Sequence, residues 1–355
     1  MVTRETWIDA WKGGLILAVV IGHVVGGGSH FATGDARAFL RGIYFWIYSF
    51  HMPAFFFVAG WLWRRKEFSP FLVGRLKRLV VPYFSVGVIS IVIFLSLHGG
   101  AVSGVTDAYY VESAGDAGGL VESLLALIHA GGWPNGNGFR FNSVLWFLPC
   151  MFTAELIYWC VDGLIPSRRI QLVLVVLMLV GCFELRHVHV PALPWGADKM
   201  LRFLPWLILG RWSRELLAGK RVAKSWELLT LVALHVCLVW LCWNVFTGPG
   251  KYWVGALAIV AGILFSLEVS QSLVRSLALA KGLSALGVSS LSIMLWHKFF
   301  VAGAQMKLPI VKALYGSGVF GAVVASAAIT GASVIVVLTG NRIYDMLASR
   351  IRRGL

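Results

Sequence analysis

A lysine and a histidine share the first apolar run of the sequence, in the stretch RETWIDAWKGGLILAVVIGHV. Asp9 and Lys12 lie at its start, and ten residues separate Lys12 from His23. On one helix these two side chains are about 16 Å apart along the axis, which is about half the hydrocarbon thickness of a bilayer. Ionisable groups at such depth are costly and usually serve function, so His23 is a candidate general base. The alternative is that Lys12 snorkels to the headgroups and His23 caps a helix end.

A second histidine lies in the next apolar run, in FHMPAFFFVAG from Phe50 to Gly60. His51 falls near the middle of this run and Pro53 follows two residues later. Proline kinks a membrane helix where a cavity or neighbouring side chains satisfy the freed carbonyl, so this pair predicts a wet pocket that also touches His23. The alternative is a core histidine hydrogen-bonded across helices.

Residues expected on the outer side form a third group. The stretch SSLSIMLWHKFF places His297 and Lys298 near the outer surface if its helix runs outward. Asn142 and Trp146 stand at the entry of another apolar run, SVLWFLPCMF, where an aromatic interfacial belt is also expected.

Basic residues cluster in RRKEFSPFLVGRLKRLVVPY at 64–83 and in RELLAGKRVAK at 214–224, which we expect to be inner loops. Clustered Lys and Arg commonly hold phosphate groups such as those of coenzyme A. The same charges also satisfy membrane topology and attract anionic lipid. The candidate ligands in the first stretch are Arg64, Arg65, Lys66, Arg75, Lys77 and Arg78.

The composition indicates what must position these residues. Of 355 residues 58% are hydrophobic and only 13% are charged, far from the roughly 25% charged of a soluble domain. This predicts an all-α, polytopic integral membrane protein. The five cysteines lie in apolar runs without metal-ligand spacing, so no disulfide framework or metal site is expected.

Apolar runs long enough to cross a bilayer recur along the chain, and we read Met1 as the mature start. The predicted bundle has about ten transmembrane helices, at 7–28, 39–63, 80–98, 144–161, 170–185, 199–213, 226–244, 252–272, 284–301 and 317–340. Lys and Arg are concentrated in alternate connections, which predicts cytoplasmic termini and accounts for the +15 net charge without a nucleic-acid partner. Within the long outer segment 99–143, the piece 120–129 is expected to be a short helix.

Taken together, these motifs resemble the membrane-bound acyltransferase 3 family, especially its fucose O-acetylase-like and exopolysaccharide O-acetyltransferase branch. The family has an Arg or Lys separated by ten residues from a histidine, as Lys12 and His23 are. The branch adds the motif from Phe50 to Gly60, a basic stretch ending in proline and tyrosine, here Tyr83, and a W-F-L helix start. The stretch SLSIMLWH is similar to the family's S-x-x-I-Y-L-x-H, with Met294 in place of tyrosine. The resemblance covers essentially the whole chain, with residues 1–345 as the transmembrane domain and 346–355 as a short basic tail.

This resemblance implies an O-acyltransferase of the bacterial cytoplasmic membrane. It implies transfer of an acetyl group from cytoplasmic acetyl-CoA to a hydroxyl of a cell-surface polysaccharide or its lipid-linked precursor. His23 would be the base, with Asp9, Lys12 and His51 in the catalytic site and Tyr83 with the basic stretch on the acyl-CoA side. The acceptor side would be formed by Asn142, Trp146, His297 and Lys298, and no cofactor would be permanently bound. Two alternatives remain: a transporter of lipid-linked sugars, and an acyltransferase acting on a lipid, peptide or small molecule.

Overall fold

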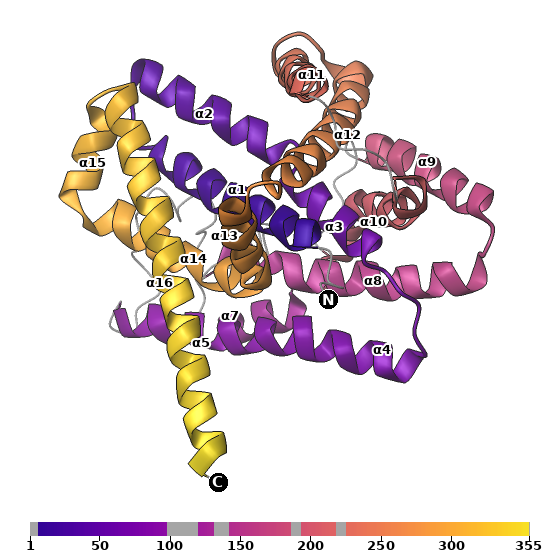
Figure 1. The fold of residues 1–355 in the computed structure, drawn as a ribbon, viewed down its shortest axis with the longest axis horizontal. Coiled ribbons are helices and arrows are strands. Elements are labelled where there is room, and N and C mark those ends of the chain that lie inside the picture. The colour runs from indigo at the N-terminus through magenta and orange to yellow at the C-terminus, as the bar shows by residue number, and fades with distance from the viewer. Residues whose placement is uncertain (1–5, 98–119, 131–141, 186–192, 218–224, 355) are drawn as a thin grey trace. The chain divides into compact units, whose positions relative to one another are not determined.

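The computed structural model describes residues 6–97, 120–130, 142–185, 193–217 and 225–354. Within these ranges the chain folds into helices joined by short connections and contains no strand (Figure 1). The chain divides into two compact units. Unit 1 comprises Met1–Ala54 and Arg221–Leu355, and unit 2 comprises Phe55–Lys220. The predicted all-α class is confirmed.

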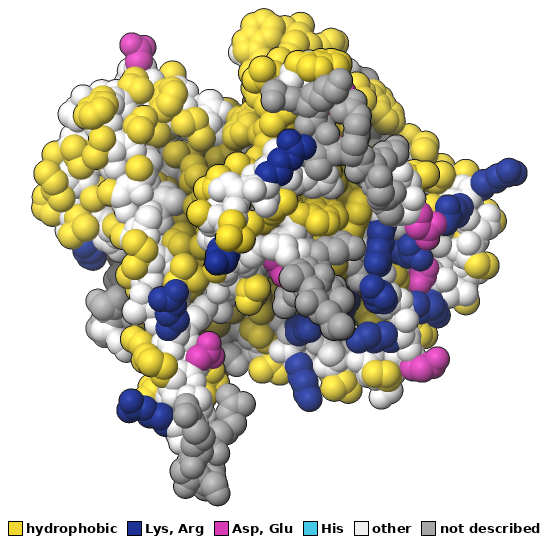
Figure 2. All heavy atoms as spheres, in the orientation of Figure 1, with side chains coloured by type: hydrophobic (Ala, Val, Ile, Leu, Met, Phe, Trp, Pro, Cys, Tyr) yellow, Lys and Arg dark blue, Asp and Glu magenta, His cyan; other side chains and the backbone are white. Residues whose placement is uncertain are grey.

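Seven helices in the described ranges are long and apolar enough to cross a membrane, or eight if one bent pair counts as a single span. All ten predicted ranges contain helix, but 168–185 and 197–217 carry too many charges to meet that criterion. Hydrophobic side chains cover much of the face shown in Figure 2. Many large apolar residues are exposed on the described helices, among them Val173, Trp226, Leu229, Trp240 and Ile335. Such a surface suits contact with lipid.

Unit 1 is assembled around the first helix. Its helices are α1 (Thr6–Gly28), α2 (Gly34–Tyr48), the start of α3 (His51–Trp61), α11 (Ser225–Asn244), α12 (Gly248–Leu273), α13 (Leu277–Val288), α14 (Ser290–Lys307), α15 (Pro309–Gly316) and α16 (Val319–Gly354). α1 contacts α2, α12, α13, α14 and α16.

The crossing of α1 with α13 depends on two glycines. A Cβ atom at Gly13 would overlap the carbonyl oxygen of Leu283, and one at Gly287 would overlap the carbonyl oxygen of Asp9. The two backbones therefore approach as closely as small residues permit in membrane helices. This contact fixes the end of α1 that carries Asp9 and Lys12.

The second predicted span is interrupted just before His51. α2 ends at Tyr48 and α3 begins at His51, so Ser49 and Phe50 form a break. Pro53 has no N–H for the carbonyl of Ser49, and its ring clashes with that carbonyl in a continuous helix. The predicted kink therefore takes the form of a break one turn before the proline.

The predicted span 284–301 is also not straight. α13 and α14 meet at Ser289 with a bend of 78°. Ser289 and Ser290 offer side-chain hydroxyls that compete with helical hydrogen bonds, which favours a break at this point. α13 and α14 both contact α1, and because of this bend they do so in different directions, which one straight helix could not do.

Unit 2 contains the remaining helices. They are α4 (Phe68–Arg75), a π-helical turn η1 (Leu76–Val80), α5 (Val81–Leu97), α7 (Leu120–His129), the 3-10 turn η2 (Ser143–Trp146), α8 (Phe147–Leu164), α9 (Arg168–Leu185), the 3-10 turn η3 (Pro194–Gly196) and α10 (Ala197–Leu217). The short helix predicted at 120–129 is confirmed as α7. In the part of α3 that belongs to unit 2, Gly60 packs against the backbone of Leu207 in α10, where a Cβ atom would overlap its carbonyl.

The sequence led us to expect a loop at the basic stretch 64–83, and this prediction is wrong for most of the stretch. Only residues 64–67 lack helix, and the chain is helical from Phe68 to Leu97 through α4, η1 and α5. The apolar residues between its cations favour this outcome, because they continue the apolar run of α5. Of the second basic stretch, residues 218–224 lie outside the described residues.

Candidate active site

Three histidines of unit 1 lie in electrostatic range of one another around α1. His23 comes from α1, His51 from the first turn of α3 and His297 from α14, and the rings of His23 and His297 are 5.2 Å apart between centroids. His51 and His297 are buried, and His23 is half-buried. Residues far apart in sequence thus form one polar cluster in an apolar bundle.

Tyr48 joins this cluster, and the sequence analysis did not identify it. Its hydroxyl lies 3.3 Å from Nδ1 of His23, and its ring lies 4.7 Å from that of His51 between centroids. Tyr48 is the last residue of α2, so the helix break directs it and His51 toward the same site. The signal in the sequence was its position three residues before His51, about one helical turn away.

Main-chain carbonyls set the tautomer of two of the histidines. Nδ1 of His51 lies 2.8 Å from the carbonyl oxygen of Ile47, and Nδ1 of His297 lies 2.8 Å from that of Ile293 and 3.0 Å from that of Met294. A carbonyl oxygen only accepts hydrogen bonds, so in each neutral ring Nδ1 carries the proton. Nε2 of each ring is then a hydrogen-bond acceptor.

Lys298 stands beside His297 in the same helix and is also buried. It lies in electrostatic range of both His23 and His297. The sequence analysis placed His297 and Lys298 near the outer surface, on the acceptor side. Both side chains are buried inside unit 1, and His297 lies beside His23. Their place near the outer surface and on the acceptor side stays a prediction.

Asp9 and Lys12 form an ion pair near the other end of α1. Lys12 Nζ lies 2.7 Å from Asp9 Oδ1. α1 is one continuous helix, so Lys12 and His23 are about 16 Å apart along its axis, as the spacing predicts. The structure does not bring Lys12 into the histidine cluster.

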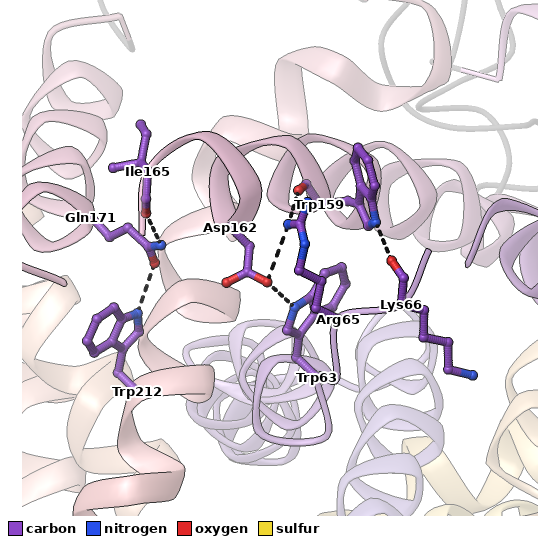
Figure 3. A network of polar contacts seen from close by, with 8 residues as sticks. All are labelled: Trp63, Arg65, Lys66, Trp159, Asp162, Ile165, Gln171 and Trp212. Carbon is purple, nitrogen blue, oxygen red and sulfur yellow. Dashed lines mark hydrogen bonds and ion pairs between the residues drawn. The ribbon is translucent and has the colours of Figure 1, made fainter. Parts of the chain in front are cut away.

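Two of the predicted acyl-CoA ligands are engaged within unit 2. Arg65 donates to the carbonyl of Trp159 at 2.9 Å, lies over its ring and pairs with Asp162 at 3.7 Å (Figure 3). Arg75 pairs with the buried Glu155, with 2.8 Å between Nε and Oε2. The sequence could not identify a partner for Glu155. These two arginines therefore hold α8 against the basic stretch.

The other predicted ligands differ in exposure. The side chains of Arg64, Lys66, Lys77 and Arg78 are exposed. Tyr83, by contrast, is buried in α5, and its hydroxyl donates to the carbonyl of Leu127 in α7 at 2.9 Å. This contact gives Tyr83 a packing role in unit 2.

The predicted acceptor-side residues of unit 2 lie at the start of α8. Asn142 is buried and precedes η2, and Trp146 is half-buried with its ring 5.5 Å from that of Phe203. They belong to a different unit from His297 and Lys298. That the four residues share one acceptor side stays a prediction.

The cluster of His23, Tyr48, His51 and His297 suits proton transfer. Among the described residues, no group of three or more His, Cys, Asp or Glu side chains is arranged to hold a metal ion. Neutral imidazoles with one protonated and one acceptor nitrogen are suited to general base catalysis. The predicted cavity that joins His23 and His51 to the inner face stays a prediction.

Comparison with known proteins identifies the fold and the class of reaction together. The family model described as an acyltransferase domain, acyltransferase 3, matches residues 5–339, which include every residue of the histidine cluster. No curated protein and no solved structure matches the chain. The match spans nearly the whole sequence and agrees with a polytopic helical membrane protein. The chain therefore belongs to the acyltransferase 3 family of membrane proteins.

Proposed function

We propose that this membrane acyltransferase moves an acetyl group from cytoplasmic acetyl-CoA to a hydroxyl of a cell-surface polysaccharide or its lipid-linked precursor, in a bacterial cytoplasmic membrane. The observation that carries the proposal is the cluster of His23, Tyr48, His51 and His297 inside a chain of this family. The polysaccharide acceptor rests on the motif from Phe50 to Gly60, which resembles the exopolysaccharide branch. No permanently bound cofactor and no nucleic acid take part.

His23 acts as the general base in this proposal. In this proposal Nδ1 of His23 carries the proton and donates to the Tyr48 oxygen 3.3 Å away, so that Nε2 offers its lone pair to the proton of the acceptor hydroxyl. The hydroxyl oxygen attacks the thioester carbon as His23 takes its proton, and a tetrahedral intermediate forms. When the intermediate collapses, the C–S bond breaks and the leaving thiolate takes the proton from His23, which restores the neutral imidazole.

His51 assists from the start of α3. Its Nδ1–H is held by Ile47, so the ring is fixed in position at the break of the helix. His51 lines the route of the pantetheine arm in this proposal. Lys12, paired with Asp9, lies about 16 Å from His23 along α1, a distance that an extended pantetheine arm can span, so Lys12 binds the nucleotide half of acyl-CoA.

The test is acetyl transfer by the purified protein in lipid nanodiscs, with labelled acetyl-CoA and the polysaccharide as acceptor. His23→Ala should lower turnover by about 10²–10⁴-fold, the usual contribution of a general base. His30→Ala is the matched control, because His30 is an exposed histidine of the same unit outside the cluster. Near-normal turnover in His23→Ala would remove His23 from the mechanism, and coenzyme A release without acetylated glycan would point to another acceptor.

A further inference from the structure

His297 presents a hydrogen-bond acceptor to the site that nothing else in the described structure uses. Its Nδ1 is committed to the carbonyls of Ile293 and Met294, so Nε2 carries the lone pair. Nε2 is buried and has no hydrogen-bond partner among the described residues. The exposed fraction of the side chain is 0%. A buried polar atom without a partner is costly, and it persists where function requires it.

The neighbouring ring indicates what this nitrogen accepts. The rings of His23 and His297 are 5.2 Å apart between centroids and inclined by 43°. A ring nitrogen stands about 1 Å out from its ring centre, so a hydrogen bond of about 3 Å between two ring nitrogens fits this separation. Two neutral imidazoles that both present lone pairs do not bond to each other. They do so once one of them is protonated.

We propose that His297 is a positioning residue whose Nε2 accepts a hydrogen bond from His23 when His23 becomes protonated during acyl transfer. The proton that leaves the acceptor hydroxyl is then held between Nε2 of His23 and Nε2 of His297 until the leaving thiolate takes it. No proton is lost or gained by the pair over the cycle. This inference rests on the proposed role of His23 as base.

Lys298 makes such an acceptor necessary. Its side chain is buried next to His297 and lies in electrostatic range of His23, which it repels whenever both are protonated. A positive imidazolium at His23 is repelled by this ammonium, and the repulsion is strong away from water. Tyr48 and His51, two further polar groups near His23, belong to α2 and α3. His297 supplies the acceptor on the side of α14.

His51 has the same tautomer as His297, but its contacts differ. Its Nδ1 also donates to the carbonyl four residues earlier, that of Ile47. The ring of His51 contacts that of Tyr48, whereas the ring of His297 contacts that of His23. The two histidines therefore have separate roles in this proposal, and His297 is the one whose ring contacts that of His23.

Two amide substitutions separate this role from a structural one. The side chain of Gln places an acceptor oxygen near the position of Nε2, and Asn places a donor near Nδ1 that keeps the bond to Ile293. We expect His297→Gln to retain kcat within about fivefold. We expect His297→Asn to lose about 10- to 100-fold in kcat with little change in KM, the effect of one hydrogen bond to a charged group. His235→Asn is the matched control, because His235 is buried in α11 with both ring nitrogens bonded and keeps its donor to Ala258.

The His297 variants are assayed for acetyl transfer in nanodiscs with labelled acetyl-CoA. The size-exclusion profile and the melting temperature show whether each variant is folded. Activity in His297→Gln with loss in His297→Asn supports the proposal. Activity in His297→Asn with loss in His297→Gln overturns it in favour of a structural role, and wild-type activity in both also overturns it. Loss in both folded variants overturns it too, because an acceptor oxygen in place of Nε2 is then not sufficient. His23→Ala is assayed in parallel. If His23→Ala keeps activity, the proposed function fails. If His23→Ala is inactive but the His297 variants give one of the overturning results, only the proposed role of His297 fails.

Discussion

The guanidinium of Arg75 and the carboxylate of Glu155 lie 2.8 Å apart at a point where the glutamate is almost completely buried. They join the end of α4 to the middle of α8 within unit 2, and Arg75 also lies over the ring of Phe71. This pair accounts for an arginine that the basic stretch suggested as a ligand of acyl-CoA.

Breaking this pair from one side should destabilise the protein. Arg75→Ala leaves a buried carboxylate without its cation, at a cost of ~3 kcal/mol, the lower end of the range for buried pairs, because Arg75 keeps a 25% exposed side chain. The melting temperature in detergent should fall for Arg75→Ala and recover in the double variant Arg75→Met/Glu155→Leu. A single variant with an unchanged melting temperature and a weakened affinity for acyl-CoA would instead make Arg75 a ligand.

Lys12→Ala should raise the apparent KM for acyl-CoA at least about tenfold or abolish transfer, because one of the few charges within α1 is lost. Arg64→Ala and Lys66→Ala should each change KM by less than about threefold, with a difference that shrinks as salt rises, since exposed cations are screened. The measurement is initial rate against acetyl-CoA concentration at two ionic strengths. An equal collapse in all three variants would indicate a defect of insertion rather than of binding.

Two adjacent glycines of α1 offer a test of the crossing with α13. Gly13→Ala forces a Cβ atom into the carbonyl of Leu283 and should cost about 1–3 kcal/mol, the usual penalty of overpacking. Gly14 is exposed with open space around it, so Gly14→Ala should be neutral or slightly stabilising because alanine favours helix. Thermal unfolding of both variants in the same detergent makes the comparison. Equal melting temperatures would show that the two helices can separate without cost.

Tyr48→Phe should lower kcat about 3- to 10-fold and leave KM nearly unchanged, because it removes one neutral hydrogen bond that orients His23. Tyr44→Phe is the control, since Tyr44 stacks on Tyr48 with ring centroids 4.0 Å apart and keeps its ring in the variant. Steady-state kinetics of acetyl transfer provide both constants. If Tyr44→Phe loses as much as Tyr48→Phe, the loss is not specific to the hydroxyl that contacts His23, and Tyr48 does not orient the base.

Apolar runs and turn signals predicted the helices well, including the short helix α7, because each long run must satisfy its backbone internally in a membrane. They did not predict the bend between α13 and α14. The residue at the bend, Ser289, is neither glycine nor proline, and the apolar run continues past it. The hydropathy pattern therefore predicts one straight helix. The helical state of 68–80 was missed for the converse reason, since cations there interrupt the apolar run without interrupting the helix.

The candidate site could be predicted in part. His23 and His51 were identified because histidines in apolar runs are conspicuous, and the structure places them in one cluster. The contact of His297 with His23 was not predicted, because it depends on the bend at Ser289 and on the packing of α14 against α1. Tyr48 was missed because a tyrosine in a membrane helix has no distinctive pattern until its neighbour is known. The pairing of Glu155 with Arg75 likewise depends on contacts between helices far apart in sequence.

The last helix has a practical consequence for imaging the protein. α16 is continuous from Val319 to Gly354, a length of about 54 Å, whereas the hydrocarbon core of a bilayer is only ~30 Å thick. More than a third of this helix must therefore stand in the headgroups or in water. A helical carrier protein joined in register to its exposed turns would move rigidly with the bundle. Such a fusion would give electron cryomicroscopy a fiducial for aligning particles of a small protein that is otherwise hidden in its nanodisc.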